Sequence, residues 1–109
     1  MKKAIFRGNT LITLRDFPSV AKQLAGFEIH RLQEGKLPRN YKPMNTIGQG
    51  VYEIRLAVSE GQYRILYIAK FAEAIYLLHA FQKKTQKTAA TDIAAGQKNY
   101  QELMKELKS

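Results

Sequence analysis

Apolar residues are concentrated in three runs in the second half of the chain, at residues 51–58, 63–69 and 74–81. The runs are rich in β-branched, aromatic and aliphatic residues, a composition typical of strands. Short polar turns separate them, so the simplest arrangement is three strands that pair consecutively and antiparallel. A further short strand is predicted near the N-terminus, over residues 3–8.

Two other segments repeat their apolar residues at helical spacing. The first spans residues 18–34, with Pro18 suited to the first helical position and Gly35 supplying the stop. Its apolar positions are Val20, Leu24, Ala25, Phe27, Ile29 and Leu32. The second segment spans residues 89–108, and the residues on its apolar face are Ile93, Tyr100, Leu103, Met104 and Leu107.

The segment between the first helix and the three strands has no sustained period. Residues 35–50 hold two prolines and three glycines, which predicts a loop that crosses to the sheet. The predicted order of elements is therefore β-α-β-β-β-α. This order indicates an α+β fold, with an antiparallel sheet and helices packed on one face. A length of 109 residues leaves room for one domain, so residues 1–109 are expected to form a single unit.

The chain is strongly basic and contains no cysteine. Lys and Arg number 18 against 9 Asp and Glu, which gives a formal charge of +9 and favours a polyanionic partner, either nucleic acid or an acidic protein. The lack of cysteine excludes disulfides, thiolate catalysis and thiol-based zinc sites. No apolar run approaches the roughly 18 residues that a membrane span needs, so we expect no membrane association and a cytoplasmic location.

Candidate chemistry lies where these strands end. Alternation in residues 51–58 predicts that Arg55 shares a solvent-facing side with Glu53, opposite an apolar face. Arg64 starts an otherwise apolar strand, so its guanidinium is expected to reach past the edge of the sheet rather than into the core. The segment at residues 83–87 adds Lys83, Lys84 and Lys87. Because these cations belong to neighbouring strands or strand ends, they are candidates for a shared phosphate site.

Simpler interpretations of the same residues stay open. Arg55 is equally suited to solvation or to an ion pair with Glu53, and three lysines at a strand end also protect an edge from pairing with other chains. His79 is expected to be a core residue bonded to a backbone carbonyl, and no metal site or Ser-His-Asp arrangement is indicated. Tyr63 and Tyr67 are predicted mainly to pack within the sheet, although they would also suit stacking on RNA bases.

Three motifs, read in order, resemble a known family. They are Glu53-Ile54-Arg55 in "GVYEIRLAV", Tyr63-Arg64 in "GQYRILYIAK", and the strand end "LLHAFQKKTQKT" at residues 77–88. Together they resemble the RelE/ParE superfamily of type II toxin-antitoxin toxins, specifically its HigB-like, phage-derived branch. That branch commonly has proline where this chain has Ala89, a helpful but dispensable residue at the start of a helix.

The resemblance implies a small RelE-like domain that cuts messenger RNA on the translating ribosome. It implies a cognate antitoxin, often a helix-turn-helix protein encoded beside the toxin, and it implies no cofactor. By position, Arg55, Arg64 and Lys84 match family residues thought to hold the scissile phosphate, with Lys83 and Lys87 as further contacts. Two alternatives remain: a ParE-type toxin that poisons DNA gyrase, and a non-catalytic basic nucleic-acid-binding module of phage origin.

Overall fold

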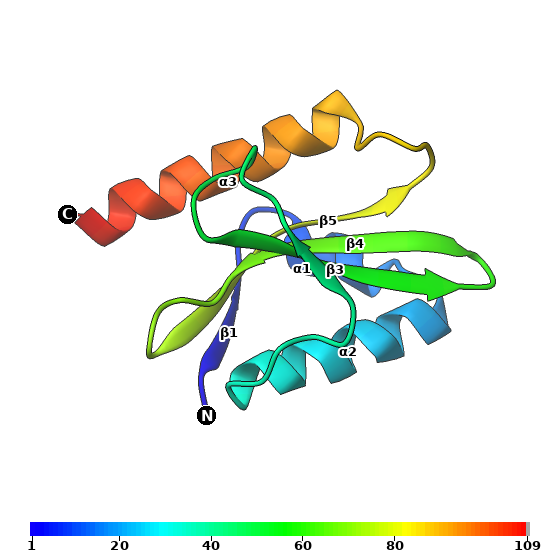
Figure 1. The fold of residues 1–109 in the computed structure, drawn as a ribbon, viewed down its shortest axis with the longest axis horizontal. Helices are drawn as coiled ribbons and strands as arrows, with labels where there is room; N and C mark the ends of the chain where they lie inside the picture. Colours follow the sequence, from blue (N-terminus) through cyan, green and yellow to red (C-terminus); the bar gives the residue numbers. More distant parts are fainter. Residues whose placement is uncertain (109) are drawn as a thin grey trace.

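The computed structural model describes residues 1–108, which fold around one mixed sheet (Figure 1). Along the chain the elements are β1 (Lys3–Phe6), α1 (Thr10–Arg15), α2 (Ser19–Gln33), β2 (Tyr41–Pro43), β3 (Val51–Val58), β4 (Gly61–Ile68), β5 (Ala74–Lys83) and α3 (Ala90–Lys108). The α+β class is confirmed. The predicted strand over residues 51–58 is also confirmed, with both of its boundaries.

The sheet has five strands in the order β1-β5-β4-β3-β2. The consecutive antiparallel pairing of β3, β4 and β5 is confirmed, but β1 pairs with β5 in parallel. The prediction of an entirely antiparallel sheet is therefore wrong at this edge. Parallel neighbours need a long crossover, and here the whole chain from α1 to β4 lies between the two strands in sequence.

The opposite edge carries a strand that the sequence did not predict. Residues Tyr41–Pro43 form β2 and pair antiparallel with the first half of β3. A three-residue strand is too short to show alternating apolar and polar residues. Its proline is tolerated because the strand lies at the edge of the sheet. The predicted loop therefore contains a short strand that extends the sheet.

Helix α2 forms as predicted, and four of its six predicted apolar positions pack on the core: Leu24, Ala25, Ile29 and Leu32. Val20 and Phe27 were assigned to its apolar face, yet both are 49% exposed. The buried positions are Ala21, Ala25, Glu28, Ile29 and Leu32. Small alanine side chains allow the helix to approach the strands closely, and the Phe27 ring instead lies 4.6 Å from the Arg39 guanidinium carbon, a cation–π contact.

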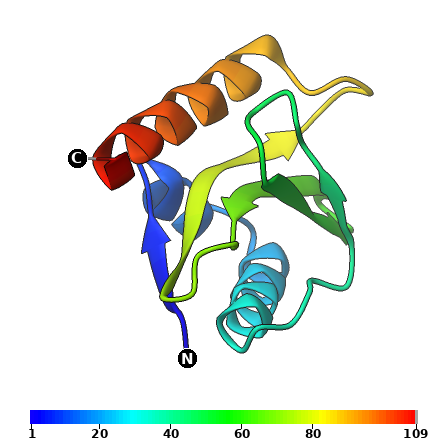
Figure 2. The same cartoon turned by 60° about the vertical axis from the view of Figure 1, so that its left-hand side comes forward.

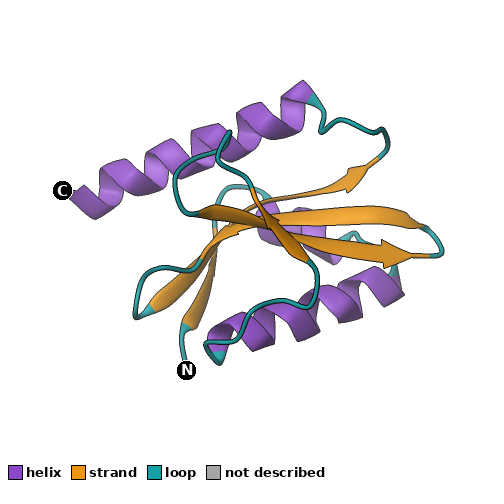
Figure 3. Cartoon of the chain, in the orientation of Figure 1, coloured by secondary structure: helices purple, strands orange, loops and turns teal. Residues whose placement is uncertain are grey.

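The helices cover both faces of the sheet (Figures 2 and 3). Helices α1 and α2 share one face, where they pack on residues such as Ile65 and Leu77. Helix α3 instead packs on the other face, where Leu103 joins the cluster that includes Leu66 and Leu78. The prediction of a single helical face does not hold for α3. The reason lies in β4 and β5, whose residues are apolar on both faces and need cover on each.

A glycine sets the distance between α3 and the sheet. A Cβ atom at Gly96 would lie 2.7 Å from Leu66 Cδ1, closer than side-chain contacts allow. Gly96 thus permits a close approach at the centre of this face. Among residues 1–108, no helix combines the length and apolar character that crossing a membrane requires.

Candidate phosphate-binding site

Two arginines lie side by side on the α3 face of the sheet. Arg55 of β3 is the direct cross-strand partner of Arg64 of β4, and Arg64 is in turn the partner of Phe81 of β5. Directly opposed residues in antiparallel strands project to the same face, and Phe81 belongs to the cluster under α3. The two guanidinium groups therefore share a face with α3.

An open hollow of about 580 Å³ forms where these strands end. Its lining residues are Arg55, Gln62, Arg64, Lys83, Lys84, Thr85 and Gln86. Four of the cations singled out in the sequence are thus brought together, and no carboxylate is among the lining residues. Such a surface suits a phosphate group, which arginine binds through two parallel hydrogen bonds.

Lys87 lies beside this hollow rather than in it. It lines a neighbouring depression together with Lys83, Lys84 and Asp92. The hydroxyl of Thr85 donates a 2.7 Å hydrogen bond to the carbonyl of Lys87, which closes the segment into a turn. The segment at residues 83–87 therefore presents Lys83 and Lys84 to the hollow and holds Lys87 on the adjoining surface.

Arg64 is buried, contrary to the prediction that it reaches past the edge of the sheet. The residue is 3% exposed, because β4 is the central strand and has neighbours on both sides. Its Nη1 donates hydrogen bonds to the carbonyl of Tyr63 at 3.0 Å and to Gln62 Oε1 at 3.4 Å. Burial lowers the pKa of Arg64 from its usual value, nearby Arg55 adds to the effect and Glu53 opposes it. Arg64 nevertheless remains a cation at neutral pH. Its hydrogen bonds hold it in one orientation at the wall of the hollow.

Glu53 provides the negative charge at this site, and the sequence did not predict its position. Alternation assigned it to a solvent-facing side, yet it is 1% exposed. Its Oε1 lies 3.6 Å from Arg64 Nε and 3.7 Å from Arg55 Nε, while Oε2 has no hydrogen-bond partner within residues 1–108. One buried carboxylate thus faces two arginines, which leaves an excess positive charge for an anionic ligand.

Arg55 differs from Arg64 in its exposure. Its side chain is 36% exposed, whereas that of Arg64 is 4% exposed. The ion pair with Glu53 that the sequence left as an alternative is present, and the same side chain lines the hollow. The accessible arginine is therefore the one an incoming anion meets first, and the enclosed arginine forms the wall behind it.

The two tyrosines suggested for base stacking are not available at this site. Tyr63 is 5% exposed, and its ring lies 4.7 Å from that of Phe17. Tyr67 is 2% exposed and belongs to the cluster under α2, on the opposite face from Arg64. Both point to the α2 face because they alternate along β4 with Arg64 and Leu66, which face α3. The predicted packing role is confirmed, and the stacking role does not fit this structure.

His79 joins β5 to the start of α3. It was expected in the core on a backbone carbonyl, but it is only partly buried, and its Nε2 lies 2.8 Å from Asp92 Oδ1. The imidazole also stacks on Phe81, with ring centroids 5.5 Å apart. Sequence reasoning missed Asp92 because the two residues belong to different elements. The contact fixes α3 relative to β5. It therefore fixes both ends of the segment at residues 83–87, called the lysine segment below.

No group of three His, Asp or Glu side chains within residues 1–108 is placed to hold a metal ion. The residues offer a buried, hydrogen-bonded arginine and lysine side chains beside it. The fold and the site together define the class: a small α+β domain whose central strands carry a cationic hollow with no carboxylate among its lining residues.

The family described as phage derived protein Gp49-like (DUF891) matches residues 13–101, a range that includes β3, β4, β5 and every lining residue of the hollow. The chain therefore belongs to this phage-derived family, which is of the RelE-like type among toxin-antitoxin toxins. No curated protein matches the chain.

Proposed function

We propose that this protein is the toxin of a toxin-antitoxin module and acts as a ribosome-dependent mRNA endonuclease. The observation that carries the proposal is the convergence of Arg55, Arg64, Lys83 and Lys84 on one hollow without a carboxylate in its lining. Membership of a toxin-type family and the charge of +9 support it independently.

The chemistry requires no group beyond RNA and side chains. The 2′-hydroxyl oxygen attacks the adjacent phosphorus, the bond from phosphorus to the 5′ oxygen breaks, and a 2′,3′-cyclic phosphate and a 5′-hydroxyl result. One proton leaves the 2′-hydroxyl and one reaches the departing 5′ oxygen. The protein must align these atoms and stabilise the extra negative charge on the phosphate oxygens.

The geometry suggests different tasks for the two arginines. Arg64 is held by Tyr63, Gln62 and Glu53, so its charge is already oriented before the substrate arrives. Such preorganisation favours the transition state over the ground state. Arg55 is more exposed and is assigned to capture of the scissile phosphate.

Lys84 is assigned to proton transfer or to stabilisation of the leaving oxygen, with Lys83 as the second candidate. Both line the hollow, and Lys84 is exposed on a turn that can follow the substrate. Lys87, on the adjoining depression, is assigned to a neighbouring phosphate. The proposal further includes a cytoplasmic location and neutralisation by a helix-turn-helix antitoxin encoded beside this chain.

Cleavage by purified protein tests the proposal. An mRNA is incubated with the protein alone and with the protein plus actively translating ribosomes, and the new ends are analysed. The expected result is cleavage only on ribosomes, with 5′-hydroxyl ends. Equal cutting of naked RNA would contradict the ribosome dependence, and DNA damage in expressing cells without RNA breaks would favour a gyrase poison instead.

A further inference from the structure

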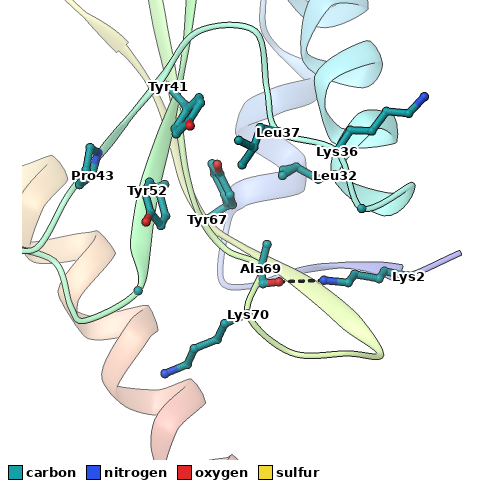
Figure 4. Close-up of a pocket in the computed structure, with 12 residues that line it drawn as sticks. Lys2, Leu32, Lys36, Leu37, Tyr41, Pro43, Tyr52, Tyr67, Ala69 and Lys70 are labelled. Carbon is teal, nitrogen blue, oxygen red and sulfur yellow. Dashed lines mark hydrogen bonds between the residues drawn. The ribbon is translucent and has the colours of Figure 1, made fainter.

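A second hollow, of about 950 Å³, lies on the α2 side of the sheet (Figure 4). Its centre is aromatic: Tyr41 of β2, Tyr52 of β3 and Tyr67 of β4 line it together. The ring centroids of Tyr41 and Tyr52 are 5.9 Å apart, and those of Tyr52 and Tyr67 are 6.0 Å apart. Three neighbouring strands thus contribute one tyrosine each to a continuous surface.

The surroundings of the tyrosines are aliphatic and partly exposed. Leu32 and Ala69 line the hollow beside Tyr67, and Leu37 stands at its margin with 60% of its surface exposed. Tyr41 and Tyr52 are 37% and 36% exposed. Large apolar side chains exposed together around a concave surface are typical of sites that bind another protein.

The charged residues that line this hollow are all lysines. The lining residues include Lys2, Lys36 and Lys70 and no carboxylate, although Lys36 Nζ also lies 3.5 Å from Glu34 Oε1 just outside the hollow. Lys2 Nζ donates to the carbonyl of Ala69 at 2.8 Å, while Lys36 and Lys70 extend on opposite sides of the rim (Figure 4). A ligand that fits here is therefore anionic at its edges and apolar at its centre.

This aromatic hollow is separate from the cationic site. The two share no lining residue. Tyr67 faces α2 whereas Arg64 faces α3, and the tyrosines lie toward the start of β3 and the end of β4, away from Lys83. A ligand in the aromatic hollow would leave the phosphate site open.

We propose that the aromatic hollow is a docking site for an acidic protein segment that packs an apolar side chain against the row of tyrosines. Aliphatic side chains around the rings favour a protein segment over a nucleotide, and the lysines at the rim, Lys70 above all, favour an acidic one. The inference rests on the proposed function, which supplies the partner: the antitoxin, bound away from the nuclease site.

Binding of the antitoxin to variants of this hollow tests the inference. The product of the adjacent reading frame is purified and titrated by calorimetry against the parent protein, Tyr41→Ala, Lys70→Glu and the control Lys98→Glu. Lys98 is an exposed lysine on α3, outside the aromatic hollow. Tyr41→Ala and Lys70→Glu are each expected to weaken binding about tenfold or more, while Lys98→Glu binds as the parent does.

Activity measurements separate the failure of this inference from the failure of the proposed function. Both hollow variants are expected to keep parental mRNA cleavage and parental thermal unfolding, and to be neutralised less well in cells. Parental antitoxin affinity in both variants would overturn the docking site. Loss of cleavage with antitoxin binding retained would assign the hollow to RNA and would also overturn it. A parent protein without cleavage would instead remove the proposed function itself.

Discussion

Glu53 Oε1 lies 3.6 Å from Arg64 Nε, and both residues are almost completely buried in the face of the sheet that lines the cationic hollow. The same carboxylate oxygen lies 3.7 Å from Arg55 Nε. The Glu53 carboxylate therefore partly neutralises both arginines and orients them toward the cationic hollow. Removing either charge from so enclosed a group leaves the other without compensation, which makes the pair a sensitive point for both stability and activity.

Glu53→Gln is expected to lower the free energy of unfolding by about 3 kcal/mol, because buried Arg64 loses its counter-charge. Urea denaturation measures the change. Glu34→Gln is the matched control, since Glu34 is a partly exposed acid whose ion pairs with His30 and Lys36 lie at the surface. A loss below about 1 kcal/mol for Glu53→Gln, or an equal loss in the control, would show that the carboxylate does not support the arginines.

Arginine-to-lysine exchanges distinguish the two arginines. Arg64→Lys keeps the charge but loses the planar fork that Tyr63 and Gln62 orient, so the rate of the chemical step is expected to fall by about 10²- to 10³-fold. Arg55→Lys is expected to raise KM with a smaller change in kcat. Single-turnover cleavage on programmed ribosomes measures both values. Identical effects of the two exchanges would contradict the division of tasks.

Asp92→Asn is expected to cost about 1–2 kcal/mol of stability, because it weakens the partly buried contact with His79. It is also expected to reduce cleavage, since the contact fixes the lysine segment. Thr91→Ala, at the exposed neighbouring position, is the control. Thermal unfolding and cleavage rates are compared for both variants. Parental cleavage by Asp92→Asn would show that the anchor is structural only.

The sequence predicted the three central strands and the proximity of Arg55, Arg64, Lys83 and Lys84, because alternation and strand ends are local properties. It could not predict the burial of Glu53 and Arg64. Both side chains lie on the face of the sheet that carries α3, whereas the sequence predicted helices on one face only. The stacking role suggested for Tyr63 and Tyr67 does not fit the structure, because alternation along β4 buries both rings on the α2 face.

The burial of Tyr67 predicts that the stability of the protein falls at alkaline pH. Burial raises the pKa of Tyr67 above its usual range, and Tyr41, Tyr52 and Glu28 add to the effect. The folded protein thus holds this proton more tightly than the unfolded chain does. The stabilisation is fully present below the usual tyrosine pKa of about 10 and is lost as the pH rises above it.

The free energy of unfolding should therefore fall more steeply above pH 10 in the parent than in Tyr67→Phe, by at most about 1.4 kcal/mol per pH unit. Denaturation at a series of pH values from about 8 to 11 measures this difference, and subtraction of the two curves removes the contribution of the lysines. Parallel curves for the two proteins would contradict the buried environment of Tyr67.

Transcript-end mapping in cells is the most direct test of the central claim that the cationic hollow cleaves mRNA on the ribosome. Total RNA is sequenced from new 5′ ends after brief expression of the parent, Arg64→Ala and the control Lys98→Ala. We expect breaks within coding regions, phased with the reading frame, for the parent and the control, and none for a folded Arg64→Ala. Phased breaks that persist in Arg64→Ala, or their absence from cells arrested by the parent, would contradict it.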